Sequence, residues 1–175
     1  MRKIKFVIIG MVLLMLFVFL KSCYNDKHGA EIYSKSNDMI LTSFLENNKV
    51  KGAYYKDTNY DENAKDSTDR YYYDEASPES RTFLIKDQET FEKIFVKNAF
   101  DVNFEQEILC LYIFADIYPN RKYVIDNVTI EEKHATIYFR IESNNKKDVA
   151  APYQRCLIVK LKEKDISSVE FIKQR

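Results

Sequence analysis

The chain has 175 residues, which is enough for one ordinary domain beside a targeting segment. It carries 27 basic and 27 acidic residues, and four of the basic ones lie in residues 1–22, which hold no acid. From Cys23 on, the balance is therefore 23 basic against 27 acidic residues, a net charge of −4. This mild acidity argues against nucleic acid and against anionic lipid as the main partner.

Residues 1–22 have the form of a secretory signal peptide, because a basic head precedes a short apolar core. The run from Phe6 to Leu20 holds no polar side chain. As a helix this run would rise roughly 22 Å, which is short of the ~30 Å hydrocarbon core of a bilayer. We therefore favour an export signal over a permanent membrane span.

The residues Leu20-Lys21-Ser22-Cys23 resemble the lipobox of bacterial lipoproteins, in which the cysteine receives diacylglycerol. They match at Leu20, Ser22 and Cys23 and depart at Lys21, where the box normally has a small, uncharged residue. We predict that Cys23 is the lipidation site. The alternative is an uncleaved N-terminal anchor in which Cys23 is incidental. Either one places the rest of the chain outside the cytoplasm, tied to the membrane of the cell envelope.

Residues 23–80 are predicted to form a polar tether. It includes one short amphipathic helix, because the apolar residues of "SNDMILTSFLENN" (36–48) fall on one helical face. The stretch 51–80 lacks Val, Ile, Leu and Phe but holds six tyrosines, which indicates a long surface loop. In this loop we expect Tyr71, Tyr72 and Tyr73 to add an edge strand. Beside carboxylates, these tyrosines are also the candidate ligand-binding residues, against the plainer interpretation of a soluble loop.

Residues 81–175 are predicted to form the compact domain. The stretch "RTFLIK" suits a strand, and Asp87 then caps a helix that runs to about Lys97. Phe91, Ile94 and Phe95 form the apolar stripe of this helix. The next apolar run, "EILCLYIFA" (107–115), is apolar on both faces and is therefore expected to be a central, covered strand.

Two alternating strands follow and are predicted to form a hairpin around Glu132, Lys133 and His134. Val124, Val128 and Ile130 mark the first strand; Ala135, Ile137, Phe139 and Ile141 line one face of the second. The stretches "RCLIVKLK" and "ISSVEFIK" supply the last two strands. The predicted fold class is α+β, with a mostly antiparallel sheet of about five or six strands and one packed helix.

The sequence offers little catalytic chemistry. No glycine follows Gly52, which excludes loops that cradle phosphate or a dinucleotide. His28 lies in the tether and His134 in a turn, so neither is a convincing catalytic base. We expect no enzyme and no cofactor, although an enzyme that uses two convergent carboxylates is a remaining hypothesis.

No metal site is predicted. Asp57, Asn59, Asp61 and Asn63 alternate as in a calcium loop, but Glu62 and Thr68 stand where an EF-hand requires glycine and a bidentate glutamate. The cysteines show no metal spacing either. Cys110 and Cys156 each lie in an apolar strand, and we expect these strands to be neighbours. An oxidising compartment would permit a disulfide between them, but we favour two buried free thiols.

The order of elements from Arg81 on resembles the C-terminal domain of bacterial protease-complex-stabilising (PrcB-type) lipoproteins. The similarity rests on "FLIKDQETFEKIF", on "VNFEQEILCLYIF", on the two alternating strands, and on "PYQRCLIVKLKE" followed by "ISSVEFIK". It covers roughly residues 81–174, and its motifs are packing features. The family commonly has a glycine-rich segment after the central strand, where this chain has "ADIYPNRKY". The resemblance implies a non-enzymatic, membrane-tethered module that binds another exported protein.

Two functions thus compete. The first is a membrane-anchored, non-catalytic lipoprotein that binds protein partners in the cell envelope. The alternative is binding of cell-wall carbohydrate or of a small ligand through the tyrosine-rich segment.

Overall fold

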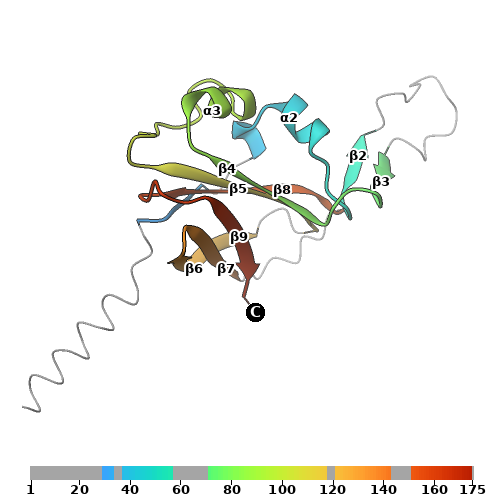
Figure 1. Ribbon diagram of the computed structural model, residues 1–175. Helices are drawn as coiled ribbons and strands as arrows, with labels where there is room; N and C mark the ends of the chain where they lie inside the picture. Colours follow the sequence, from blue (N-terminus) through green and yellow to red (C-terminus); the bar gives the residue numbers. More distant parts are fainter. Residues whose placement is uncertain (1–28, 34–36, 57–70, 118–120, 143–150, 175) are drawn as a thin grey trace, which may run out of the picture.

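The computed structural model describes residues 29–33, 37–56, 71–117, 121–142 and 151–174 (Figure 1). The predicted signal segment with Cys23, and the stretch 57–68 that we considered for calcium, lie outside the described residues. Within the described ranges, no helix is long and apolar enough to cross a membrane.

The centre of the molecule is a four-stranded, fully antiparallel sheet. Its order is β1 (Glu31–Tyr33), β8 (Tyr153–Leu161), β5 (Ile108–Asp116) and β4 (Ser80–Ile85). The predicted central strand is indeed β5, which pairs with β8 on one side and with β4 on the other. Burial on both faces explains its unbroken apolar sequence.

A second sheet of three strands packs against one face of the first. It consists of β6 (Lys122–Glu131), β7 (His134–Glu142) and β9 (Ser168–Lys173), with β7 in the middle. The predicted β6–β7 hairpin is confirmed, and its turn is formed by Glu132 and Lys133. The last strand, β9, pairs with β7 in parallel.

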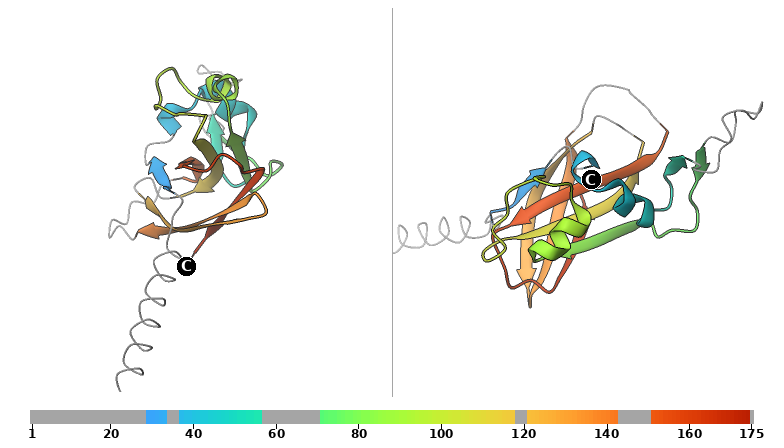
Figure 2. Two further views of the ribbon diagram at one scale, coloured as in Figure 1. Left: turned by 60° about the vertical axis from the view of Figure 1, so that its left-hand side comes forward. Right: turned by 90° about the horizontal axis from the view of Figure 1, so that it is seen from above.

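Helices cover the other face of the four-stranded sheet, so the described part of the chain has three layers (Figures 1 and 2). They are a short 3₁₀ helix (η1, Asn37–Met39), α2 (Thr42–Asn47) and α3 (Gln88–Ile94). The predicted cap of α3 is confirmed, because the Asp87 side chain accepts a hydrogen bond from the Thr90 amide at 2.7 Å. Hydrogen bonds from Thr90 lower the pKa of Asp87.

The helix α3 ends at Ile94 and not near Lys97 as predicted. Phe95 adopts an extended backbone and forms an isolated antiparallel bridge with Ile40, and the Ile94 carbonyl accepts from the Leu41 amide at 2.9 Å. A tertiary contact therefore replaces the last predicted helical turn.

Alternate side chains of β5 enter two separate cores. Leu109, Leu111 and Ile113 pack towards the helices, whereas Ile108 and Cys110 pack towards the three-stranded sheet. This alternation follows from the two-residue period of a strand. The α+β class and the dominance of antiparallel pairing are confirmed. The predicted numbers of strands and helices are not, because the described residues form nine strands in three sheets and two α-helices.

The buried face of β6 changes along the strand. Tyr123, Ile125 and Val128 are buried, whereas Val124 and Ile130 are only half-buried. The pairing register between β6 and β7 shifts between Ile125 and Asn127. Such a bulge inserts one residue and reverses the inward phase of the strand, which simple alternation cannot anticipate.

Residues 37–56 belong to the folded body, so the predicted polar tether is wrong for this range. Ile40, Val50 and Ala53 are buried in the core beneath the helices. Asn37 holds this segment to β8, since its side chain accepts from the Cys156 amide at 3.0 Å and donates to the Gln154 carbonyl at 2.8 Å. Isolated apolar residues in a polar segment show no helical or strand periodicity, so the sequence pattern does not predict that they are buried.

Candidate functional site

The candidate residues Tyr71, Tyr72 and Tyr73 form β3 (Tyr71–Tyr73), which pairs antiparallel with β2 (Tyr54–Lys56). The two strands form a small separate sheet that projects beyond the end of the main sheet (Figures 1 and 2). All three side chains are exposed, Tyr71 the most at 56%. The predicted strand is therefore present, but it pairs with β2 and not with an edge of the central sheet.

The base of this two-stranded sheet is held to the body by Tyr55. Its hydroxyl accepts from the Val50 amide at 2.8 Å and donates to the Val50 carbonyl at 3.1 Å. Burial is the main reason that the pKa of Tyr55 is raised. The Lys49 ammonium lies 5.4 Å from the centre of the Tyr55 ring and 5.0 Å from that of Tyr72, and it also donates to the Tyr72 hydroxyl. These contacts fix Tyr72 on the face opposite Tyr71 and Tyr73.

A buried polar cluster lies at the end of β5. The Asp116 carboxylate accepts from the Arg121 guanidinium at 3.1 and 3.2 Å and from the Tyr123 hydroxyl. The Asp116 side chain is only 6% exposed, so its charge requires these donors. Burial, and secondly the hydrogen bond to Asp116, raises the pKa of Tyr123 far above its ordinary value. The hydroxyl of Tyr123 therefore stays protonated and serves as a donor.

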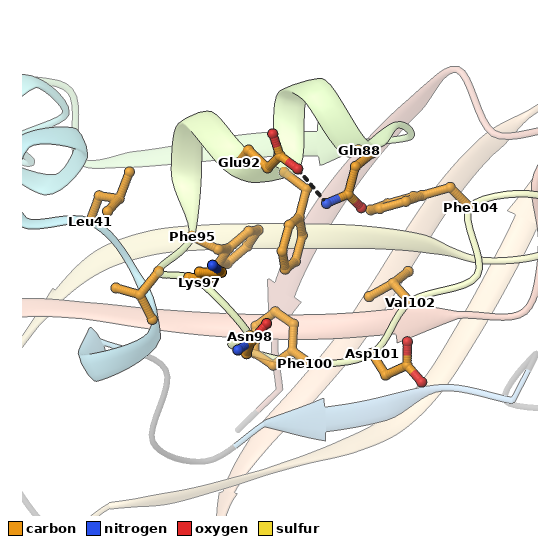
Figure 3. Close-up of a pocket in the computed structure, with 12 residues that line it drawn as sticks. Leu41, Gln88, Glu92, Phe95, Lys97, Asn98, Phe100, Asp101, Val102 and Phe104 are labelled. Carbon is orange, nitrogen blue, oxygen red and sulfur yellow. Dashed lines mark hydrogen bonds between the residues drawn. The ribbon is translucent and has the colours of Figure 1, made fainter.

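A second candidate site is a groove beside α3, which we call the phenylalanine groove. It has a volume of about 670 Å³ and is drawn in Figure 3. Its apolar part consists of Leu41, Phe91, Phe95, Val96, Phe100, Val102 and Phe104. Phe91 comes from α3, and the other phenylalanines come from the end of that helix and the loop that follows it.

Local hydrogen bonds hold the loop of residues 95–107, which we call the groove loop, in place. Asn98 has a positive φ of 61°, which turns the chain sharply after Phe95. Asn103 then forms a compact turn, because its carbonyl accepts from the Glu107 amide at 2.8 Å and its side chain accepts from the Glu105 amide at 3.1 Å. The loop therefore presents Phe100 and Phe104 towards α3 as a defined surface.

The four phenylalanine rings form one connected cluster. The centre of the Phe91 ring lies 4.8 Å from that of Phe95, 5.9 Å from that of Phe100 and 6.0 Å from that of Phe104. Phe95 and Phe100 are edge to face at 5.1 Å. Phe91 and Phe95 are buried, whereas Phe100 and Phe104 are half-buried and keep apolar surface in the groove.

The rim of the phenylalanine groove is polar and mainly acidic. Glu92 and Asp101 line it opposite a single Lys97, and the Gln88 amide donates to Glu92 at 2.8 Å across the top of the groove (Figure 3). The segment 86–107 that builds the groove holds six acidic and three basic residues, a net charge of −3. An apolar floor with an acidic rim fits a basic, apolar segment of a partner.

Of the remaining candidates, the structure describes His134, Cys110 and Cys156, whereas His28 lies outside the described residues. The His134 imidazole forms a hydrogen bond of 2.7 Å with the Ser168 hydroxyl on the three-stranded sheet, and its Nε2 lies 3.6 Å from the Glu170 carboxylate. Burial raises the pKa of both Cys110 and Cys156 to about 12. Among the described residues, no group of His, Cys, Asp and Glu could hold a metal ion.

No family model, curated protein or solved structure matches this chain. The resemblance to the PrcB-type domain therefore stays a prediction, and the functional argument rests on the geometry above.

Sequence reasoning missed both the phenylalanine groove and the Asp116 cluster. Phe91 and Phe95 were assigned to the core stripe of a helix, which is correct for their burial. The available signal was Phe100 and Phe104, two large aromatics in a short loop rich in Asp, Asn and Glu. Aromatic residues in a loop of that composition indicate either a packed loop or a binding surface.

Proposed function

We propose that this protein is a non-catalytic, protein-binding lipoprotein of the cell envelope, and that its phenylalanine groove receives a segment of another exported protein. The single observation that carries the proposal is the half-buried pair Phe100 and Phe104 in a preformed groove of about 670 Å³. Aromatic side chains in such positions supply much of the binding energy at protein interfaces.

The partner segment has a defined chemistry in this proposal. It presents one bulky apolar side chain to Phe100 and Phe104, and lysine or arginine on either side of it to Glu92 and Asp101. The acidic segment 86–107 supports this choice, because opposite charge steers the encounter and disfavours acidic competitors.

A labelled peptide tests the groove. The probe is a short synthetic peptide with a Phe-Leu anchor between lysines, compared with the same peptide carrying glutamates in their place. Fluorescence anisotropy with the full chain in mild detergent should show that only the basic peptide binds. The double variant Glu92→Lys/Asp101→Lys should weaken it by about ten-fold, since both side chains are exposed on the rim.

The control is Glu105→Lys, which makes the same charge change as Asp101→Lys alone and on the same loop, but outside the groove lining. It should leave the affinity nearly unchanged. Equal binding of both peptides, or an equal loss in Glu105→Lys, would show that the groove does not select this segment.

The anchor part of the proposal rests on Cys23 and its lipobox-like context. Two or three acyl chains hold a protein on a membrane stably, whereas one chain does so only marginally. Metabolic labelling with a clickable fatty acid should mark the wild-type chain and not Cys23→Ser. If both are unlabelled and residues 1–22 persist in the mass spectrum, the protein has an uncleaved anchor instead.

A further inference from the structure

A second cleft lies at the opposite end of β5 from the phenylalanine groove. The groove loop leads into the first residue of β5, whereas the cleft is built around its last residue, Asp116. The cleft has a volume of about 430 Å³, which is within the usual range for small-ligand sites. Its lining residues come from the turn before β2, from β3, from the start of β4, from the second half of β5, from the residue before β6, from β7 and from the end of β9.

One wall of the cleft is aromatic. Tyr73 is 43% exposed there, and Tyr112 and Phe114 stack with ring centres 5.1 Å apart and planes 19° apart. Gly52 has a φ of +83°, and the Tyr73 hydroxyl lies 3.4 Å from the position that a Cβ at residue 52 would occupy. The hydroxyl end of Tyr73 therefore lies against the body beside residue 52. Flat aromatic faces of this kind suit the apolar C–H face of a sugar ring.

The inner end of the cleft supplies fixed polar groups. Asp116 and Arg121 both line it, and their mutual hydrogen bonds together with Tyr123 hold the two planar groups in one orientation. A carboxylate accepts hydrogen bonds and a guanidinium donates up to five. Adjacent hydroxyl groups both donate and accept, so a fixed acid–guanidinium pair matches the hydroxyls of a saccharide.

The outer part of the cleft is positively charged. Lys51 and Lys173 line it together with a single outer acid, Glu79. Neither lysine forms an ion pair with another residue among those that the structure describes. With Asp116 and Arg121 cancelling each other, the outer lining has a net charge of +1, which favours a ligand that carries one negative charge.

We infer that this cleft binds an acidic saccharide, with a sugar ring on Tyr73, its hydroxyls on Asp116 and Arg121, and its carboxylate beside Lys51 and Lys173. The site uses none of the residues of the phenylalanine groove, so either site can fail without the other. Of the three candidate tyrosines, only Tyr73 takes part in this site, because Tyr73 lines the cleft and neither Tyr71 nor Tyr72 does.

Titration with two oligosaccharides tests the inference. The probes are a glucuronic-acid oligosaccharide and a glucose oligosaccharide of equal length, each added up to about 10 mM to the full chain in mild detergent. Nuclear magnetic resonance of ring-labelled tyrosines should show saturable shifts with the acidic probe and much weaker ones with the neutral probe. Tyr73→Ala and Lys173→Ala should each weaken binding by about ten-fold.

Tyr71→Ala is the matched control, because Tyr71 lies on the same strand and the same face as Tyr73 but outside the cleft. It should bind as the wild type does. Absence of saturable shifts in the wild type, equal binding of the neutral probe, or an equal loss in Tyr71→Ala would each overturn the inference. Because all three variants change exposed side chains, each should keep the wild-type melting temperature.

Discussion

The turn between β6 and β7 places two non-glycine residues in a backbone conformation that favours glycine. Glu132 and Lys133 have φ values of 48° and 69°, the left-handed conformation that a two-residue hairpin turn requires. Glycine or asparagine usually occupies these positions, because an L side chain costs about 1–2 kcal/mol there. The sequence has no glycine after Gly52, so this turn retains that cost.

Replacing Lys133 by glycine should therefore stabilise the protein. We expect Lys133→Gly to raise the free energy of unfolding by about 0.5–1 kcal/mol, because relief of the left-handed strain outweighs the loss of an exposed ion pair with Asp165. Urea denaturation measures the change. The control Glu131→Gly, at the last residue of β6, should be destabilising, since glycine weakens a strand. A loss of stability in Lys133→Gly would show that the left-handed backbone at Lys133 does not destabilise the protein.

Whether Cys110 and Cys156 can form a disulfide depends on the face of the sheet on which each side chain lies. Cys110 and Cys156 lie in neighbouring strands, as predicted, but Cys110 pairs with Val159 and Cys156 with Ile113. Cys110 packs towards the three-stranded sheet and Cys156 towards the helices. Opposite faces of one sheet cannot be joined by a disulfide without moving the backbone. Both thiols are free, as we had favoured.

Neither thiol should react in the native protein. Burial raises both pKa values to about 12, so at pH 7 almost no thiolate is present and reagent access is blocked as well. Iodoacetamide labelling followed by peptide mass mapping should find both cysteines unmodified in the native protein and both modified in guanidinium chloride. Native labelling of either one, or a bridged peptide after mild oxidation, would contradict the burial of these strands.

The helix α3 connects the core to the phenylalanine groove. Ile94 is buried against the sheet while Phe91, one turn earlier, contributes to the groove as well as to the core. The seven residues of α3 are too few for a stable isolated helix. Its stability must therefore come from the Asp87 cap and from this packing.

Shortening Ile94 should consequently cost much of that packing. We expect Ile94→Ala to lower the free energy of unfolding by about 2–4 kcal/mol through lost burial and the cavity left behind. Lys93→Ala, whose exposed ion pair with Glu89 is worth at most about 0.5 kcal/mol, is the control on the same helix. Chemical denaturation monitored by circular dichroism compares the two. A cost near zero for Ile94→Ala would show that the helix does not depend on the sheet.

Residues before Arg81 complete the folded unit. β1 adds the edge strand beside β8, and the segment 37–56 places Ile40 and Val50 in the core. Each such side chain contributes about 1.5–3 kcal/mol on burial, in a domain whose total stability is about 5–15 kcal/mol.

A chain that starts at Arg81 should therefore fail to fold by itself. We expect it to show no cooperative thermal transition and poorly dispersed amide resonances, whereas a chain that starts at Gly29 should keep both signatures of a folded domain. Differential scanning calorimetry and nuclear magnetic resonance provide the comparison. A cooperative transition in the shorter chain would mean that α3 and the strands from β4 to β9 suffice without β1 and the segment 37–56.

Local patterns predicted the elements whose hydrogen bonds and periodicity are themselves local. Asp87 predicted the start of α3, the unbroken apolar run predicted β5 as a covered strand, and the alternation around Glu132 predicted the β6–β7 hairpin. In each case the residues that carry the signal are the residues that make the structure.

Long-range pairing was decided only in the folded molecule. Strands pair through backbone groups, which are the same in every strand. A short stretch of sequence therefore does not predict that β9 pairs with β7 in parallel or that β3 pairs with β2. The two candidate sites depend on the same information. The phenylalanine groove joins Leu41 to α3, and the cleft joins Tyr73 and Asp116 to Lys173, which only the tertiary fold brings together. Composition and the N-terminal pattern predict a compartment and a class of chemistry, but a binding surface requires residues that are distant in the sequence to meet in the fold.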